Sequence, residues 1–222
     1  MRSSRIAAAF LLLVLLAGCS PGAVASPSSA APTPQASETD GTLKLTKTGT
    51  RPLEPGTYTY DGFTPRIELT IGSGGWVGAD TFGDFFDVQI DPGSPDVIAV
   101  QFAKPSAIFD GSGSAPAATT PEAAVAALAA NATLESTEPE SVTVDGRAGQ
   151  RITVTAIGAG AHGIMTIREG TLSILADRRL DLTFIATESD GLLAIMVGGS
   201  VARWDAATAA AEPVVGSVRI GP

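Results

Sequence analysis

The side chains that most often carry catalysis are scarce in this sequence. His162 is the only histidine and Cys19 the only cysteine among 222 residues. A serine hydrolase of the α/β class needs a Gly-x-Ser-x-Gly turn, followed along the chain by an acid and then a histidine. Ser200 stands in the run Gly-Gly-Ser-Val-Ala, which lacks the final glycine, and His162 precedes it. The sequence therefore favours a protein that is not an enzyme.

One acidic cluster is a candidate metal site. Its members are Asp80, Asp84, Asp87, Asp91 and Asp96, spaced 4, 3, 4 and 5 residues apart. Calcium takes six to eight oxygen ligands, and calcium loops of the EF-hand type place acids at every second residue. Because the spacing does not fit and an extended chain would spread the carboxylates, we expect a solvated acidic edge. A calcium site is the alternative, and no metal is predicted.

Two glycine-rich runs resemble nucleotide-binding loops only in part. Residues 158–163 match Gly-x-Gly-x-x-Gly, but the pattern that follows, Ile-Met-Thr-Ile, is typical of a strand. A dinucleotide site needs a helix there, whose N-terminal amides face the pyrophosphate. Residues 72–75 lack the lysine of a phosphate-binding loop. Both runs are expected to be turns, with His162 as a solvated side chain, and no cofactor is predicted.

Four aromatic residues lie close together in a chain that is only 5% aromatic. They are Trp76, Phe82, Phe85 and Phe86. Core packing is the ordinary role of such a group, because aromatic side chains bury a large apolar area. The alternative is an exposed aromatic rim that meets a lipid, a glycan or another protein. These four residues are the candidate binding surface that the sequence offers.

The N-terminal residues have the features of an export signal. Arg2 and Arg5 precede an uninterrupted apolar run at residues 6–17. A run of twelve is too short to span a bilayer, which needs about 20 residues. The run ends in Leu16-Ala17-Gly18-Cys19, which resembles a bacterial lipobox. That resemblance implies cleavage before Cys19 and acylation of its sulfur, whereas the alternative is a secretory signal with an incidental cysteine.

Lipid attachment at Cys19 would place the protein on the extracytoplasmic face of the cell membrane. Two or three acyl chains anchor a protein stably, since each buried methylene contributes about 0.8 kcal/mol. The chain has a net charge of −9, and loss of the leader with its two arginines makes it −11. Such a domain is repelled by anionic lipid and lacks the basic face that nucleic acid requires.

The composition divides the chain into three parts. Residues 1–18 are the expected signal peptide, and residues 19–40 form a Pro-, Ser- and Ala-rich tether that begins at the lipidated cysteine. The tether has too little apolar bulk to offset its ordering entropy, so we expect it to be disordered. Residues 41–222 are long enough for one substantial core and are predicted to form a single domain.

Within that domain most apolar residues alternate with polar ones, which predicts strands. The expected strands are 57–60, 66–71, 86–90, 97–102, 142–144, 150–157, 164–168, 171–176, 180–186 and 192–197. Thr120 and Pro121 predict the start of one helix, as N-cap and first residue. A second helix is expected at 200–211 and to end at Pro213. This order predicts an α+β fold, a largely antiparallel sheet packed by two helices.

The layout is similar to the PsbP-like fold and, within it, to actinobacterial lipoproteins of the LpqN type. The residues that carry the resemblance are 69–76, the helix after Pro121, the hairpin at 142–149 and the segment 204–218. It covers most of residues 56–220 and implies a binding or assembly factor. No catalytic residue set is implied, because the family has no shared catalytic signature to match.

These observations lead to two functional hypotheses. The first is a membrane-anchored cell-envelope lipoprotein that binds another protein or assists assembly without catalysing a reaction. The second is a carrier of an apolar ligand such as a lipid. An adaptor needs an exposed apolar patch, whereas a carrier needs an enclosed apolar cavity of several hundred Å³.

Overall fold

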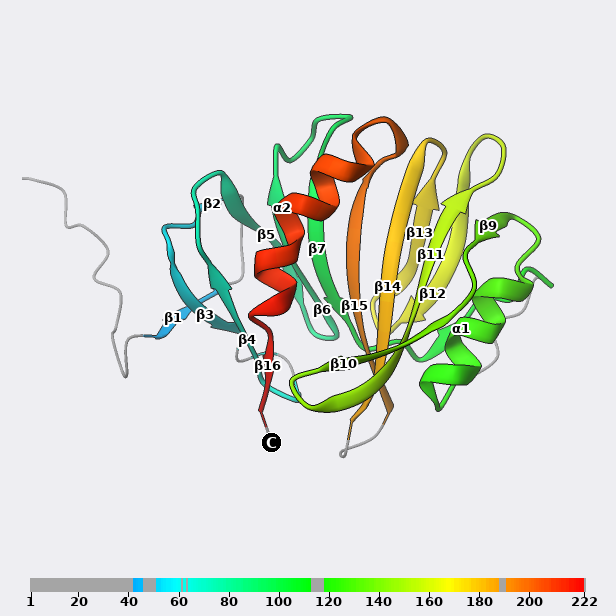
Figure 1. Cartoon of the computed structure of the whole chain (residues 1–222), viewed down its shortest axis with the longest axis horizontal. Coiled ribbons are helices and arrows are strands. Elements are labelled where there is room, and N and C mark those ends of the chain that lie inside the picture. Colours follow the sequence, from blue (N-terminus) through cyan, green and yellow to red (C-terminus); the bar gives the residue numbers. More distant parts are fainter. Residues whose placement is uncertain are drawn as a thin grey trace, which may run out of the picture. The chain divides into compact units, whose positions relative to one another are not determined.

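The computed structural model describes residues 42–45, 51–60, 62, 64–112, 118–187 and 191–221, without the side chains of 42, 44 and 79–82. The chain divides into two compact units, residues 1–35 and 36–222, and every described residue belongs to the second. The expected signal peptide and tether therefore lie outside the described residues. Figure 1 shows the second unit as a coloured ribbon.

A sheet of nine described strands forms the centre of this unit (Figure 1). Its strands, in spatial order, are β10 (Glu140–Val144), β11 (Arg147–Ala156), β14 (Arg178–Thr187), β15 (Gly191–Ser200), β7 (Ile98–Ala103), β6 (Phe85–Ile90), β5 (Trp76–Phe82) and β2 (Arg51–Pro52), with β9 (Leu134–Ser136) also paired to β11. All of these pairings are antiparallel. The central strand β15 is buried on both faces, which explains its continuous apolar run.

Two smaller sheets accompany the central one. The first contains β1 (Thr42–Lys44), β3 (Gly56–Tyr60), β4 (Ile67–Ile71) and β16 (Arg219–Ile220), with β1 parallel to β3. The second contains β13 (Gly170–Leu175), β12 (Ala161–Ile167) and β8 (Ala107–Ile108), all antiparallel. In Figure 1 β12 and β13 lie behind β14 and β11, whereas α2 lies in front of β7 and β15.

The first helix, α1 (Pro121–Ala130), begins where its capping residues predict. The hydroxyl of Thr120 accepts a hydrogen bond from the backbone N–H of Ala123 at 3.2 Å. Pro121 occupies the first helical position, where its missing N–H leaves no intrahelical bond unmade. Val125 and Leu128 turn inward against β11 and β14. The cap and the short apolar stripe together fix this helix on the sheet.

The second helix begins later and ends later than the sequence predicts. Residues Val201–Arg203 form a 3₁₀ turn, and α2 runs from Trp204 to Gly216, with Pro213 inside it. Pro213 is exposed and lies in the last turn, so its ring faces solvent while Val214 still packs inward. The buried residues are Ala207, Ala211 and Val214.

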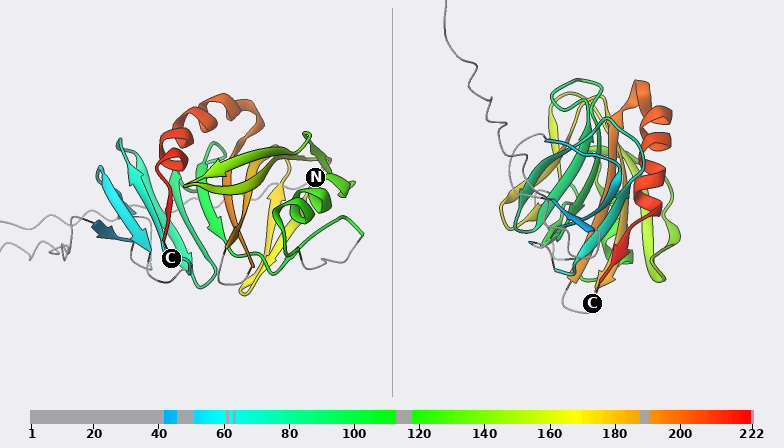
Figure 2. Two further views of the ribbon diagram at one scale, coloured as in Figure 1. Left: turned by 60° about the horizontal axis from the view of Figure 1, so that its bottom comes forward. Right: turned by 90° about the vertical axis from the view of Figure 1, so that its left-hand side faces the viewer.

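Two hydrophobic clusters fill the two faces of the central sheet. Ile185, Leu193 and Ile195 pack on the face that α2 covers, together with residues of β3 and β4. Leu182 and Phe184 pack on the opposite face, with α1 and β12. Each fully buried side chain of this size contributes about 1.5–3 kcal/mol. The structure confirms the predicted fold class, a largely antiparallel α+β fold with two helices; Figure 2 shows both helices against the strands.

Candidate functional site

The predicted lipidation site cannot be located in the fold. Cys19 and the lipobox residues Leu16, Ala17 and Gly18 lie outside the described residues, as does the tether of residues 19–40. Of the described residues, no helix is long and apolar enough to cross a membrane. The lipid anchor therefore stays a prediction.

The aromatic group belongs to the core. Trp76 is 2% exposed, Phe85 is buried, and Phe86 is fully buried in a stack on Phe102 with ring centroids 4.5 Å apart. Phe85 and Phe86 are adjacent in β6 and point to opposite faces, one into each hydrophobic cluster. The prediction of a binding surface is therefore wrong for these three residues. Phe82 belongs to β5, and its side chain lies outside the described part of the chain.

Three aspartates of the acidic cluster, Asp84, Asp87 and Asp96, have separate partners. Asp87 is buried and accepts hydrogen bonds from the side-chain amides of Gln89 at 2.6 Å and Gln101 at 3.4 Å. Asp84 pairs with Arg168 at 3.4 Å, and Asp96 lies 3.6 Å from the guanidinium of Arg203. A solvated edge is thus the wrong description of Asp87. Within the described residues, no three acids, histidines or cysteines are grouped to hold a metal.

The histidine and the serine of the hydrolase comparison belong to different strands. His162 is a half-buried residue of β12, so the expectation of a solvated loop side chain is wrong. Its Nε2 atom is buried and has no hydrogen-bond partner among the described residues. Ser200 ends β15, and its Oγ lies 3.4 Å from the carboxylate of Asp96. Among the described residues, no hydrogen bond joins His162 to a hydroxyl nucleophile.

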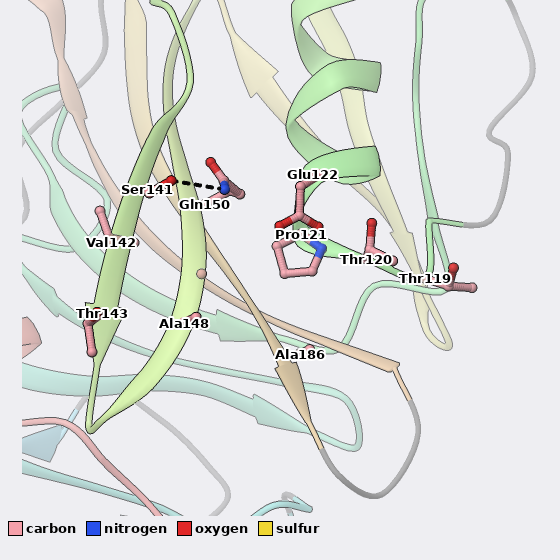
Figure 3. Close-up of a pocket in the computed structure, with 11 residues that line it drawn as sticks. Thr119, Thr120, Pro121, Glu122, Ser141, Val142, Thr143, Ala148, Gln150 and Ala186 are labelled. Atoms are coloured by element: carbon pink, nitrogen blue, oxygen red, sulfur yellow. Dashed lines mark hydrogen bonds between the residues drawn. The ribbon is translucent and has the colours of Figure 1, made fainter.

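An open groove lies between the β10–β11 hairpin and the first turn of α1 (Figure 3). We call it the hairpin groove, and its volume is about 550 Å³. The residues that line it are Thr119, Thr120, Pro121 and Glu122 before and in α1, Ser141, Val142 and Thr143 of β10, Ala148, Gly149 and Gln150 of β11, and Ala186 of β14. It is the candidate functional site of the described domain.

A tight turn positions one wall of the hairpin groove. Asp145 and Gly146 connect β10 to β11 with φ angles of 49° and 75°, and Val144 pairs directly with Arg147. This is a two-residue turn, shorter than the connection that the sequence suggested, because Asp-Gly tolerates two consecutive positive φ angles. The carboxylate of Asp145 also accepts the backbone N–H of Ile220 at 2.7 Å. The tip of the hairpin is thereby held against the last strand, β16.

Hydroxyl and amide groups dominate the chemistry of the hairpin groove. Gln150 donates from Nε2 to the hydroxyl of Ser141 at 3.3 Å, across the paired strands (Figure 3). Glu122 is exposed in the first turn of α1, and a hydrogen bond from its own backbone N–H lowers its pKa. The Thr120 hydroxyl and the Gln150 amide lower that pKa further. At neutral pH the groove therefore presents an ionised carboxylate among neutral donors and acceptors.

The side chains of the hairpin groove offer hydrogen bonds, one negative charge and apolar contacts. A general base must titrate near the working pH, and the lowered pKa of Glu122 moves its carboxylate away from that range. The lining residues include no histidine, lysine, arginine or cysteine. They also include no aromatic ring on which a sugar could stack. What remains is hydrogen bonding, attraction of a positive charge to Glu122, and apolar contact with Pro121 and Val142.

Sequence reasoning found the parts of the hairpin groove but not the groove itself. The Thr120–Pro121 helix start and the hairpin around Asp145–Gly146 were both expected from local patterns. Their juxtaposition depends on the pairing of β11 with β14, whose paired residues lie about 30 positions apart in the chain. Local sequence patterns do not predict that pairing.

Comparisons with known proteins do not assign this chain to a family. No family model matches the chain, and no curated protein matches it. The chain is similar to the solution structure of cyanobacterial PsbP (CyanoP) from Synechocystis sp. PCC 6803, at 12% sequence identity and a TM-score of 0.38. The similarity covers 69% of this chain and 86% of that one. A similarity at this TM-score says nothing about function.

Proposed function

We propose that this protein is a bacterial cell-envelope lipoprotein, anchored through Cys19 and related to the PsbP-like, LpqN-type lipoproteins, whose domain binds another protein. It catalyses no reaction in this proposal. The hairpin groove is the observation that carries it. An open trough of hydroxyls, one amide and one carboxylate matches the mixed polar and apolar surface of a polypeptide segment.

The same groove disfavours the carrier hypothesis. A lipid carrier needs an enclosed apolar cavity, because a water-filled trough leaves acyl chains exposed. The hairpin groove is open, and hydroxyls of Thr119, Thr120, Ser141 and Thr143 line it. The clusters on both faces of the sheet are packed with the protein's own side chains. The most suitable ligand is therefore a polar segment with a basic side chain opposite Glu122.

A matched pair of alanine substitutions tests the groove. Ala148 is exposed and lines the hairpin groove, whereas Ala130 is exposed at the far end of α1 and does not. Ala148→Arg and Ala130→Arg add the same bulk and charge to the lipidated full chain. The assay measures a protein that co-purifies with the wild-type chain from the native envelope in a constant ratio. We expect Ala148→Arg to weaken its affinity by at least about tenfold, or 1.4 kcal/mol, and Ala130→Arg to leave that affinity unchanged.

Two results would contradict the proposal. One is a partner that both variants retain or both lose, which would place binding elsewhere or show misfolding. The other comes from native mass spectrometry on residues 38–222 purified without detergent from a lipid-containing host. Extra mass that organic extraction removes would favour the carrier hypothesis instead.

A further inference from the structure

The strand β13 has one open edge. It lies at the margin of the sheet with the order β13-β12-β8, and among the described strands it pairs only with β12. The turn at Arg168–Glu169 joins the two strands, with Ile167 opposite Gly170. On its other side β13 offers backbone groups that no strand of the described residues pairs with.

The register identifies those groups. The N–H of Ala176 donates to the carbonyl of Gly160, so Ala176 faces β12. Because backbone groups alternate in direction along a strand, Leu172 and Ile174 also face β12. Thr171, Ser173 and Leu175 then direct their N–H and C=O groups outward. We call these outward groups the β13 edge.

The β13 edge lacks the features that normally protect an edge strand. Charged side chains, proline or a covering element usually blunt such edges. The strand Gly-Thr-Leu-Ser-Ile-Leu contains neither a charged residue nor a proline. Leu175 is 55% exposed, which is unusual for a leucine beside a packed sheet. An exposed, uncharged edge of six residues is a template for another strand.

A second groove lies beside this edge. Its volume is about 180 Å³, and one wall is formed by Ser173, Ile174 and Leu175 of β13. The opposite wall belongs to the central sheet, where Ala99 of β7 and Gly198 of β15 leave room because their side chains are small or absent. A strand added to the β13 edge would place alternate side chains in this groove.

We propose that the β13 edge receives an extended, uncharged segment of a partner protein as an additional β-strand. The backbone supplies the affinity, through hydrogen bonds to Thr171, Ser173 and Leu175. Ala99 and Gly198 leave room in the groove for small side chains at every second position, and Arg178, which also lines it, disfavours a basic one. This proposal rests on the proposed function for the class of partner, a protein, but concerns a surface separate from the hairpin groove.

A second copy of the chain is a poorer occupant. The antiparallel self-pairing that satisfies all three outward residues is centred on Ser173. In that register the turns at the two ends of the strand bring Glu169 of one copy near Asp177 of the other, and Arg168 near Arg178. Like charges brought together at the ends of the pair repel each other. A neutral segment of another protein avoids this repulsion.

Amide hydrogen exchange on the full chain in detergent tests the proposal. The probe is an uncharged capped peptide, Gln-Thr-Val-Thr-Val-Thr-Val-Gln, whose valines form one apolar face. At about 1 mM peptide we expect exchange at Thr171, Ser173 and Leu175 to slow by about tenfold or more. A peptide with the same side chains but N-methylated throughout should have no effect, since it cannot pair.

Substitutions at Ser173 separate pairing from side-chain contact. Ser173→Pro removes one outward N–H and leaves the bonds to β12 intact, because proline is tolerated at the free side of an edge strand. It should abolish the protection, whereas Ser173→Ala should retain it. Protected amides at Leu172 and Ile174 show that the proline variant is folded.

Three outcomes overturn the proposal. They are unchanged exchange at the three amides, protection that survives Ser173→Pro, and a dimer that protects these amides without peptide. The proposed function fails separately, because Ala148→Arg alters the hairpin groove and should leave peptide pairing at β13 unchanged.

Discussion

Asp181 shows how a single half-buried carboxyl couples this fold to pH. It lies on β14, where the guanidinium of Arg151 approaches its Oδ1 at 3.7 Å, and Arg151 also pairs with Glu140. Burial raises the pKa of Asp181 above its ordinary value, and the attraction of Arg151 offsets only part of that effect. The carboxylate is therefore less favourable in the folded chain than in the unfolded chain.

The raised pKa of Asp181 determines how the free energy of unfolding changes with pH. Between the ordinary pKa of 3.8 and the raised value, the folded chain binds more protons than the unfolded chain. Asp181 therefore makes the free energy of unfolding fall as pH rises through that window. Asp181→Asn removes the titrating group, so we expect higher stability than wild type at pH 7 and a smaller difference at pH 3. Urea unfolding at both pH values measures this, and an equal difference at both would contradict it.

Individual residues also show what local patterns can and cannot reveal. Thr120 as N-cap was predictable, because its role depends only on the next three residues. The burial of Phe85 and Phe86 on opposite faces was not, because it requires both faces of β6 to be covered. The same limit applies to His162, whose half-buried position depends on the pairing of β12 with β13.

At the scale of elements, the contact between α2 and β15 depends on a glycine. A Cβ atom on Gly199 would lie 2.6 Å from the Cβ of Ala207, which belongs to the helix itself. That atom cannot move without shifting α2. Close packing against α2 therefore explains the glycine at position 199. The partial match of residues 198–202 to a nucleophile turn follows from this packing requirement.

Gly199→Ala should destabilise the fold by about 1–3 kcal/mol, the usual range for overpacking. Gly72→Ala is the matched control, since a Cβ there would meet nothing within 4 Å and should change stability by about 0.5 kcal/mol or less. Thermal unfolding of both variants measures the contrast. A double-mutant cycle with Ala207→Gly should recover part of the loss, and additive effects would contradict direct contact.

The boundaries of elements were less predictable than their existence. The expected end of the second helix at Pro213 was a reasonable inference, because proline removes a backbone donor. The structure retains the helix to Gly216, since Val214 is buried against the sheet while Pro213 is exposed. The packing of Val214 therefore outweighs the loss of a helical hydrogen bond at Pro213.

At the scale of the whole molecule, the sequence predicts the class of fold but not the sites that the fold creates. Alternating apolar residues and two helical segments were sufficient for an antiparallel α+β arrangement. The hairpin groove and the groove beside the β13 edge form where local hairpins lie against elements that are distant in sequence, α1 and β14 for the first and β7 and β15 for the second. Strand order therefore carries the functional information that single residues lack.

The location of the whole protein depends on the predicted lipobox at residues 16–19. Without the proposed leader the chain has a net charge of −11 and no electrostatic reason to bind anionic lipid. In the proposed function, membrane retention depends on acyl chains at Cys19. Cys19→Ser should move the protein from the membrane fraction to the soluble fraction and abolish labelling by an alkyne palmitate analogue. Ser20→Ala, the adjacent control, should keep both.

A high-salt wash distinguishes a lipid anchor from attachment to the membrane through charge. Charge-mediated attachment is released by salt because screening shortens its range, whereas acyl chains resist it. Wild-type protein that is soluble and unlabelled would show a simple secretory signal with an incidental cysteine. Cys19→Ser protein that stays on salt-washed membranes would require a binding partner embedded there, and the anchor assignment would fail.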